Sequence, residues 1–412
     1  MGAALRSRFS VDKKKIFLVS LGHLSCDING GALPASLPYL RAAHNLDYQA
    51  TGGLMLAYSC LSSLIQPLLG LLADKHNKPW FVPLGVALAG CGIAMMGFLS
   101  SYWAIFLGIA ISGIGSAFFH PEGARFANRV SGKSKGTGMS IFSIGGNSGF
   151  IIGPLMVTFF VGTFGLPGMA VFGITALIMA FILVFSISRI SPANIPAQKA
   201  MDEVEASAAD PAAAEGDALA AESGGEGVNN WRVFSRLTLV IVSRSIVFAG
   251  CNTFIPLYWV NVFGQSKAAG AFALVFFGIC GVCCNMAGGL LTDRYGSVRI
   301  IRTAFIIMPL VLLAFSLNSS LALAWAILPC FGLMLYLPFS AQVVLGQKLL
   351  AKNIGFASGV TLGLATTLGG IAQPCLGWLA DQAGLSSIFL CLACVGCVGC
   401  LMSFTLPTSH DA

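Results

Sequence analysis

The chain has 412 residues, of which 56% are hydrophobic and only 9% are charged, and its mean hydropathy is +0.83. Soluble domains have about 25% charged residues, so this composition excludes a soluble globular protein. The net charge of +7 comes from lysines and arginines between apolar segments. We therefore interpret it as a signal of membrane topology and expect no nucleic-acid partner.

Apolar stretches of about 20 residues recur along the chain, each long enough to cross a hydrocarbon core of about 30 Å as a helix. The sequence predicts an all-α integral membrane protein with twelve spans: Ile16–Leu40, Ala50–Ala73, Pro79–Leu99, Tyr102–Ala124, Gly136–Val161, Pro167–Ser188, Leu237–Val260, Lys267–Leu291, Val298–Leu317, Leu321–Leu345, Gly355–Ala380 and Leu385–Leu406. The first stretch is too long for a signal-peptide core, so we expect it to be helix one of the mature chain.

Lysines and arginines are distributed unevenly between alternate loops. Twenty of the 23 fall on one side, Arg41 and Lys267 fall on the other, and Arg244 lies inside a span. Cytoplasmic loops carry the excess of these residues. We therefore expect a multi-pass protein of the cytoplasmic (inner) membrane of the cell, with both termini in the cytoplasm and the lipid bilayer as its surroundings.

Residues 191–234 differ from the rest of the chain because they are rich in alanine, glycine and acidic residues. Such a segment cannot bury a core, so the sequence predicts a disordered cytoplasmic linker. It separates a six-helix bundle in residues 1–190 from a second six-helix bundle in residues 235–412.

The two predicted bundles resemble each other in sequence. GLLADK at Gly70–Lys75 recurs as GLLTDR at Gly289–Arg294, and the pair Gly165 and Leu166 recurs as Gly384 and Leu385 at the same offset of 219 residues. Two six-helix halves in parallel repeat are typical of a secondary transporter whose site lies between the halves.

Several motifs carry a resemblance to known transporters. GLLADKHNK, GLLTDRYGSVR and GGNSGFIIGP resemble the loop motif and the fifth-helix motif of the major facilitator superfamily. GHLSCD, QPLLGLLADKHNKPW and FFHPEGARFANRVSGKSKGTGMSIFSIGGNSG resemble the fosmidomycin resistance protein family. The fifth-helix motif is associated with antiporters in that superfamily.

The resemblance implies a major facilitator fold and a proton-coupled efflux antiporter for a small molecule, such as an anionic, fosmidomycin-like antibiotic or a metabolite. A proton-coupled importer of an organic anion or other small metabolite is the alternative, because the residues do not fix the direction of transport. A channel or a transporter-like sensor is a rival from another class. We expect a monomer with a small-molecule substrate and protons as its partners.

Ionisable side chains inside a membrane are costly and therefore informative. Asp27 lies about 16 Å into helix one, close to the midplane, and His23 is one turn earlier on the same face. We expect this pair to share or pass the coupling proton. The alternative is a buried hydrogen bond that only fixes helix packing.

The stretch FFHPEGARF contains His120, Glu122 and Arg125. It follows about 27 Å of helix from Tyr102, so we expect it near the cytoplasmic end of the membrane and apart from Asp27. The prediction is a proton relay or gate, and the alternative is a simple helix cap. A metal site made of His23, His120 and Glu122 is not expected, because their depths differ.

Arg244 lies in the second half, opposite Asp27, with Asn252 two turns further on. Its planar guanidinium suits a phosphonate or carboxylate. It is equally suited to neutralise Asp27 or Glu122 as a structural counter-ion. The remaining residues expected to line the substrate cavity are Tyr258, Tyr336 and Gln342.

Charged pairs end helices two and eight. Asp74 with Lys75, and Asp293 with Arg294, are expected to hold the cytoplasmic side shut by ion pairs that break when the halves rock. The alternative is termination of two helices by solvated charge.

No sequence feature indicates an enzyme or a cofactor. H-E-x-x-H, G-x-S-x-G and the phosphate-binding G-x-x-x-x-G-K-S pattern are absent. The thirteen cysteines lie mostly in the predicted spans. Cys391, Cys394, Cys397 and Cys400 have ligand-like spacing, but on a helix their sulfurs spiral around the axis instead of converging on a cluster.

Overall fold

The computed structural model describes residues 13–66, 69, 79–131, 135–187, 229–353, 357, 360–361 and 365–407. Within these ranges the regular structure is helical, without strands. The first bundle contains α2 (Lys13–His44), α3 (Tyr48–Leu64), α5 (Phe81–Met95), α6 (Tyr102–Val130), α7 (Lys135–Met156), η1 (Val157–Val161), α8 (Gly162–Phe164), η2 (Leu166–Met169) and α9 (Ala170–Ile187). The second contains α12 (Trp231–Asn261), α13 (Lys267–Tyr295), α14 (Ser297–Ser316), α15 (Leu321–Leu349), η4 (Ala351–Asn353), α17 (Ala365–Ala383) and α18 (Leu385–Phe404).

The described part of the chain holds 9 helices that are long and apolar enough to cross a membrane. The helices α3 and α5 are shorter, and parts of the second and eleventh predicted spans lie outside the described residues. The all-helical membrane architecture is therefore confirmed, whereas the count of twelve stays a prediction. In lipid this architecture follows from the need to satisfy backbone polar groups within each segment.

Among the boundaries that differ from the sequence prediction, two bear on the site and on the linker. The helix α6 continues six residues past the predicted end at Ala124, to Val130. The predicted linker reached residue 234, but α12 begins at Trp231. Asn230 precedes it, and its side chain accepts a hydrogen bond from the backbone N–H of Val233. An asparagine in this position satisfies one of the unpaired donors of a first helical turn. Residues 188–228 of the predicted linker lie outside the described residues.

The sequence repeat has a counterpart in the backbone. Gly165 and Gly384 both have positive φ, 68° and 82°, and each directly precedes a helix, η2 and α18 respectively. Positive φ is readily available only to glycine. The same tight connection thus occurs at corresponding places in both bundles.

The long helix α2 lies inside the first bundle, and α9 lies on its outside. Along α2 most residues are buried, including polar ones such as Ser20 and Asn29. In contrast, α9 exposes large apolar side chains, among them Ile174, Phe181 and Phe185. Exposed apolar faces on outer helices are suited to lipid, and polar groups are concentrated on the inner helices.

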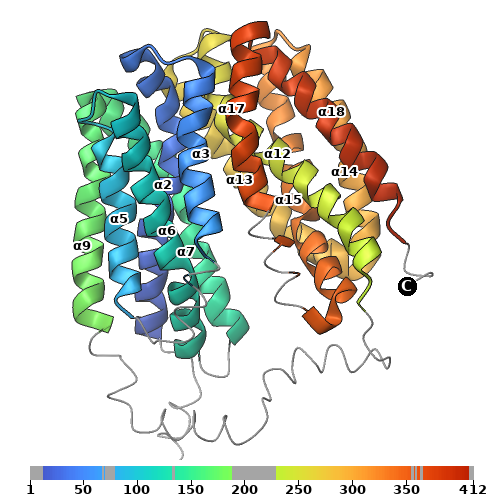
Figure 1. The fold of residues 1–412 in the computed structure, drawn as a ribbon, viewed down its shortest axis with the longest axis horizontal. Coiled ribbons are helices and arrows are strands. Elements are labelled where there is room, and N and C mark those ends of the chain that lie inside the picture. The colour runs from blue at the N-terminus through green and yellow to red at the C-terminus, as the bar shows by residue number, and fades with distance from the viewer. Residues whose placement is uncertain are drawn as a thin grey trace, which may run out of the picture.

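The two bundles lie side by side, the first in blue to green and the second in yellow to red (Figure 1). We call the end where α9 ends and α12 begins the linker end, and the end where α2 ends and α3 begins the far end. The far end contains contacts between the bundles. Arg41 donates to Asn261 Oδ1 at 3.3 Å, and the Lys267 ammonium lies 4.8 Å from the centre of the Tyr39 ring.

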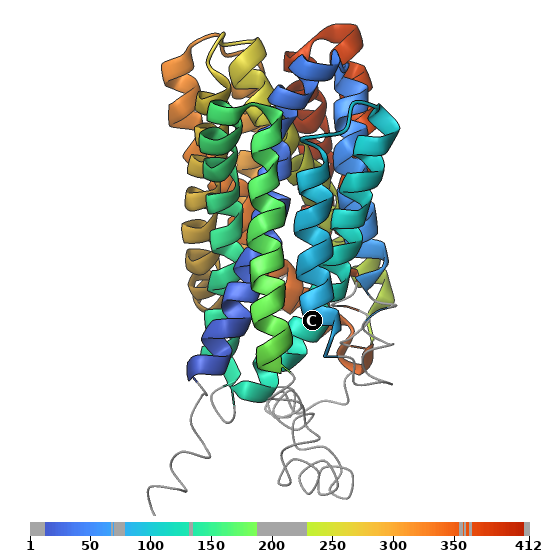
Figure 2. The ribbon, with the colours of Figure 1, turned by 90° about the vertical axis from the view of Figure 1, so that its left-hand side faces the viewer.

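The helices of the first bundle run roughly parallel to one another between the two ends (Figure 2). In Figure 1 the ribbons of the two bundles approach each other toward the far end and stand apart toward the linker end. The most extensive contacts across the bundles are those of α3 with α17, α7 with α13, and α2 with α12. This arrangement closes the far end.

Glycines of the fifth-helix motif bring α7 against α2. Gly145, Gly149 and Gly153 repeat every four residues, so they share one face of α7. A Cβ atom on Gly149 would lie only 2.6 Å from the backbone nitrogen of Ile28. Small residues at this spacing allow membrane helices to pack at backbone contact. The motif therefore fixes α7 beside the part of α2 that carries Asp27.

We predict that Gly149→Ala destabilises the first bundle, because the added methyl group forces α7 away from α2. Overpacking of this kind costs about 1–3 kcal/mol. Thermal unfolding of the purified protein in detergent should show a lower midpoint. Ser148→Ala is the matched control, since the Ser148 hydroxyl donates to the carbonyl of Ile144 on its own helix. A Gly149→Ala protein with the wild-type midpoint would contradict the packing described above.

Candidate functional site

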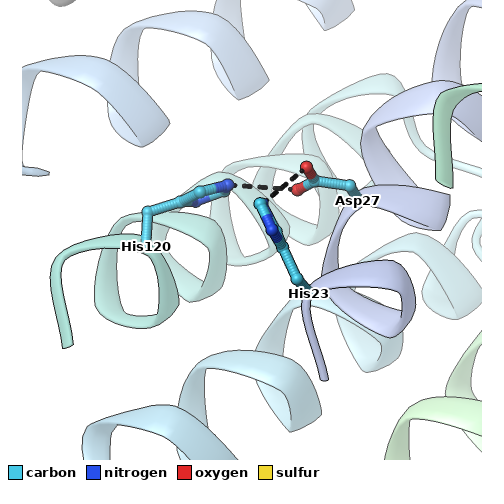
Figure 3. Close-up of side chains that lie close together, drawn as sticks. All are labelled: His23, Asp27 and His120. Atoms are coloured by element: carbon cyan, nitrogen blue, oxygen red, sulfur yellow. Dashed lines mark ion pairs between the residues drawn. The ribbon is translucent and has the colours of Figure 1, made fainter. Parts of the chain in front are cut away.

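Asp27 lies near the middle of α2, and each of its carboxylate oxygens faces an imidazole nitrogen. Oδ2 is 3.1 Å from Nε2 of His23, one turn earlier on the same helix, and Oδ1 is 3.2 Å from Nε2 of His120 on α6. Figure 3 shows the two rings meeting the carboxylate from two helices. Asp27 is 5% exposed and His23 is 8% exposed. We call these three residues the His–Asp cluster.

The position of His120 corrects the sequence prediction, which separated it from Asp27 by depth. The prediction measured His120 from the start of α6 and assumed that the helix ended near Ala124. Because α6 continues to Val130, His120 lies well inside the helix and at the level of Asp27. The stretch FFHPEGARF therefore contributes directly to the buried centre of the first bundle.

Close packing of α7 leaves room for the cluster only because residue 146 is glycine. A Cβ atom there would lie 2.5 Å from Nε2 of His23 and 2.7 Å from Oδ2 of Asp27. The ring of His23 also stacks on Phe142 of α7, with centroids 4.0 Å apart. The helix α7 thus forms one wall of the cluster.

The second nitrogen of each imidazole contacts a backbone carbonyl oxygen. His23 Nδ1 is 2.8 Å from the carbonyl oxygen of Phe142, and His120 Nδ1 is 2.8 Å from that of Ser116. A carbonyl oxygen only accepts hydrogen bonds, so these contacts are satisfied by the tautomer that carries a proton on Nδ1. Two neutral imidazoles would then present unprotonated Nε2 atoms to the carboxylate oxygens. The cluster is satisfied only when it binds additional positive charge.

Protons are one source of this charge, and a divalent metal ion is another. The ligand atoms of His23, Asp27 and His120 lie within 4.8 Å of one another. Two histidines held by carbonyl oxygens, together with one carboxylate, also have the chemistry of a transition-metal site. The depth argument against a metal site was therefore wrong for His120, although Glu122 is not among the three.

Glu122 is buried at 3% exposure and pairs with Arg125 on its own helix. The Arg125 Nη2 atom lies 2.9 Å from Oε1 and 2.8 Å from Oε2 of Glu122. Residues two apart on a helix point in different directions, so Glu122 and His120 make separate contacts. The stretch FFHPEGARF therefore divides between the His–Asp cluster and a neighbouring ion pair.

Arg244 lies near the middle of α12, the first helix of the second bundle, and is 8% exposed. Its Nε atom donates to Gln342 Oε1 at 2.8 Å, and Nη1 donates to the carbonyl oxygen of Leu335 at 3.2 Å. The guanidinium lies 5.1 Å from the ring centre of Phe339. All three partners are on α15, which therefore orients the planar group.

The structure corrects the counter-ion alternative for Arg244. In the described part of the chain, Arg244 forms no ion pair with a carboxylate. Asp27 is instead paired with two histidines, and Glu122 is paired with Arg125. A buried guanidinium that contacts only neutral groups keeps a substantial desolvation cost. An anion placed beside this guanidinium would reduce that cost.

The other residues expected at the substrate cavity lie at different levels. Gln342 contacts Arg244, and the Tyr336 ring packs between Phe248 and Phe277. Asn252 is about 12 Å further along α12 than Arg244.

Tyr258 is about 21 Å from Arg244 along the same helix. It is 1% exposed, packs on Phe389, and its hydroxyl is 3.0 Å from Ser386 Oγ. These contacts belong to the interior of the second bundle, so we leave Tyr258 out of the proposed substrate site.

The residues predicted to act as gates are only partly described. Asp74 and Lys75 lie outside the described residues. Asp293 and Arg294 are exposed near the end of α13, and the Arg294 guanidinium lies 5.3 Å from the ring centre of Tyr295. Exposure at the linker end agrees with both the predicted gate in its open form and the simple helix terminus.

Some parts of the site were missed by sequence reasoning. The carbonyl groups of Phe142 and Ser116 orient the two histidines, and any residue type supplies a carbonyl. The approach of α3 was missed as well: the Tyr58 hydroxyl on this helix lies 2.7 Å from where a Cβ of Gly30 would be. The one available signal was the consecutive pair Gly145 and Gly146, which indicated close approach without naming the neighbour.

Comparisons with known proteins identify the family and the fold of the chain. The family model described as Major Facilitator Superfamily matches residues 19–374. The chain is 28% identical over 396 residues to the fosmidomycin resistance protein of Escherichia coli (strain K12), and this covers 95% of the chain and 92% of the relative. It is also 28% identical over 399 residues to the uncharacterized MFS-type transporter YfnC of Bacillus subtilis (strain 168), with the same coverage of 95% and 92%.

Solved structures share the fold at low sequence identity. A bacterial homolog of the human lysosomal transporter Spinster, in an inward-facing and occupied conformation, is similar with a TM-score of 0.76 and 14% identity, covering 96% of this chain and 97% of that one. The nucleoside transporter NupG has a TM-score of 0.71 and 16% identity, covering 96% of this chain and 100% of that one.

We predict that the Glu122 and Arg125 pair is energetically coupled. Glu122→Gln removes the charge that compensates Arg125 and should lower the free energy of unfolding by about 1–3 kcal/mol. Glu122→Gln combined with Arg125→Gln should cost less than the sum of the two single changes, because the double variant lacks both charges of the pair. Denaturant unfolding in detergent measures all three variants. Strictly additive effects would show that the pair contributes no coupling.

Proposed function

The chain belongs to the Major Facilitator Superfamily and is a secondary transporter, not an enzyme, and from this premise we propose that it exports a small anion in exchange for protons. The His–Asp cluster binds the protons and Arg244 binds the anion. The proposed location is the inner membrane, with both termini in the cytoplasm and the protein acting as a monomer. Protons moving down their gradient supply the energy.

The hydrogen bonding of His23 and His120 is the observation that carries this proposal. Both Nδ1 atoms donate to carbonyl oxygens, while both Nε2 atoms face Asp27 at 3.1 and 3.2 Å. Without extra protons, acceptor atoms face each other across these distances. Proton binding therefore makes the contact between α2 and α6 attractive, and proton loss makes it repulsive.

The cluster lies on helices that also contact the other bundle. The helix α2 meets α12, and α7, the wall of the cluster, meets α13. A change in the contacts of α2 and α7 is thus able to bias the packing between bundles, which is what coupling to a transport cycle requires. Glu122 and Arg125 are proposed as a relay between the cluster and the linker end.

Arg244 supports an anionic substrate. Its Nε and Nη1 atoms bond to Gln342 and Leu335, which leaves the Nη2 side of the guanidinium for a further acceptor. Guanidinium groups bind carboxylates and phosphonates through parallel N–H donors. Gln342, whose buried Nε2 atom has no hydrogen-bond partner among the described residues, supplies a second donor beside it. Asn252 and Tyr336 are proposed as more distant parts of the same cavity.

Two considerations favour export over import. A relative that covers nearly the whole chain is named for resistance to fosmidomycin, and export of a drug produces resistance. The fifth-helix motif, whose glycines face Asp27 and Ile28, is associated with antiporters in the superfamily. Proton loading and substrate loading would then alternate in successive half-cycles.

Import of an anion together with protons is the second candidate, and electrostatics favours it. A protonated His–Asp cluster carries more positive charge than a deprotonated one. An anion at Arg244 in the same protein would therefore bind more favourably when the cluster is protonated. Such mutual attraction promotes loading of proton and anion together, and the direction assay below separates the two candidates.

We predict that Asp27→Asn abolishes transport driven by a proton gradient, because a neutral amide lacks the negative charge that stabilises protonated histidines. Inside-out membrane vesicles with an acidic interior should accumulate radiolabelled fosmidomycin when they contain the wild-type protein. In the variant this accumulation should fall by about 5- to 150-fold, the range of a coupling free energy of about 1–3 kcal/mol. Exchange of labelled for unlabelled substrate without a gradient should persist.

Asp47→Asn is the control for removing a carboxylate, because Asp47 caps α3 far from the cluster and asparagine caps helices equally well. Full gradient-driven accumulation by Asp27→Asn would remove Asp27 from the coupling mechanism. Wild-type vesicles that lose preloaded substrate under the same gradient would instead establish proton-coupled import.

Arg244→Lys and Arg244→Gln test the anion site. Lysine keeps the charge but loses the planar fork, so the KM for fosmidomycin should rise by about 10-fold, and by about 100-fold for glutamine, as expected for hydrogen bonds to a charged group of about 1.5–3 kcal/mol. The gradient dependence should be retained in both. Initial rates of uptake into vesicles give KM, and an unchanged KM in Arg244→Gln would exclude this residue from the site.

A further inference from the structure

Asp381 joins the two bundles at the far end. It lies in the last turn of α17, and its carboxylate contacts the first turn of α3 in the other bundle. Oδ1 accepts a hydrogen bond from the backbone N–H of Tyr48 at 2.8 Å, and Oδ2 accepts one from that of Gln49, also at 2.8 Å. One side chain of the second bundle thus binds two backbone donors of the first.

These two donors are among the backbone N–H groups of a first helical turn, for which the helix itself has no acceptor. The first N–H groups of an α-helix have no acceptor in the preceding turn, and the helix dipole makes this end attractive to a carboxylate. On α3, the N–H of Ala50 is satisfied by Asp47 at 2.6 Å within the same bundle. The N–H groups of Tyr48 and Gln49 depend on Asp381.

Glycines on both helices allow this approach. A Cβ atom on Gly52 of α3 would collide with the backbone around Gln373 and Pro374 of α17, and one on Gly377 of α17 would collide with the backbone of Tyr48. Asp381 is one turn beyond Gly377 on the same face of α17. The helix crossing and the carboxylate contact therefore form one continuous interface.

Arg41 of the first bundle adds a second contact between the bundles in the same region. Its guanidinium lies 4.1 Å from the ring centre of Tyr48, and its Nη1 atom donates to Asn261 of the second bundle. The contact between Asp381 and α3 is exposed to solvent. Water can therefore replace the carboxylate when the bundles separate, which makes the contact reversible.

We propose that Asp381 is a positioning residue of the transport cycle, which holds the far end closed by capping α3 from the opposite bundle. The contact exists only while α3 and α17 are together. It therefore stabilises the state with the far end closed over the state with the far end open, and its loss shifts the population toward the latter. The proposal depends neither on the coupling ion nor on the substrate.

Hydrogen exchange of the full-length protein in lipid nanodiscs, without substrate, tests the proposal. In Asp381→Ala, exchange should become at least about threefold faster on both sides of the far-end contact, in residues 44–52 and 256–265. It should become slower at the linker ends of α13 and α15, because closing that end accompanies opening of the other. Asp381→Asn keeps one acceptor oxygen and should give an intermediate result, and Asp381→Glu should restore most of the wild-type pattern.

Asp47→Ala is the matched control. It removes a hydrogen bond from the same helical turn, but one that lies within a single bundle, so faster exchange should be confined to residues 47–50. The same confined pattern in Asp381→Ala and Asp381→Asn, with the linker ends unchanged, would overturn the proposal. This outcome would leave proton coupling and the anion site unaffected, because neither enters the measurement.

Discussion

The burial of a carboxylate within a membrane-spanning bundle is the constraint on which the rest of the structure depends. Asp27 is 5% exposed, and an uncompensated charge at such a place is costly. His23 and His120 supply the compensation only if α6 reaches α2 at the right level, and α7 closes the cluster only if residue 146 is glycine. The FFHPEGARF stretch and the fifth-helix motif are thus two consequences of one buried charge.

The second bundle solves the opposite electrostatic problem. Arg244 occupies the middle of α12 as Asp27 occupies the middle of α2, but its partners are an amide, a carbonyl group and an aromatic ring. The first bundle therefore surrounds its buried charge with two histidines, and the second surrounds its buried charge with neutral groups. In the proposed mechanism, this asymmetry within a repeated fold separates the proton site from the substrate site.

The sequence predicted the helical membrane architecture, the internal repeat and the pairing of His23 with Asp27, because these depend on hydropathy, on fixed offsets and on neighbours one turn apart. It misplaced His120, since the level at which two helices meet depends on how far α6 continues beyond the apolar segment. The roles of the Phe142 and Ser116 carbonyl groups were not readable, because backbone acceptors carry no residue signature. Asp381 was missed because it lies in a solvent-exposed turn, where an acidic residue is unremarkable.

The far-end contact and the His–Asp cluster lie on different helices, but α3 connects them. Asp381 binds α3, and Tyr58 further along α3 reaches toward Gly30 on the helix that carries Asp27. Both kinds of contact bring a carboxylate beside nitrogen atoms, but Asp381 meets backbone N–H groups, which are always protonated, whereas Asp27 meets imidazoles, which exist with or without a second ring proton. The far-end contact is therefore a constant contribution to closure. In the proposed transport cycle, the contribution that varies with proton binding comes from the His–Asp cluster.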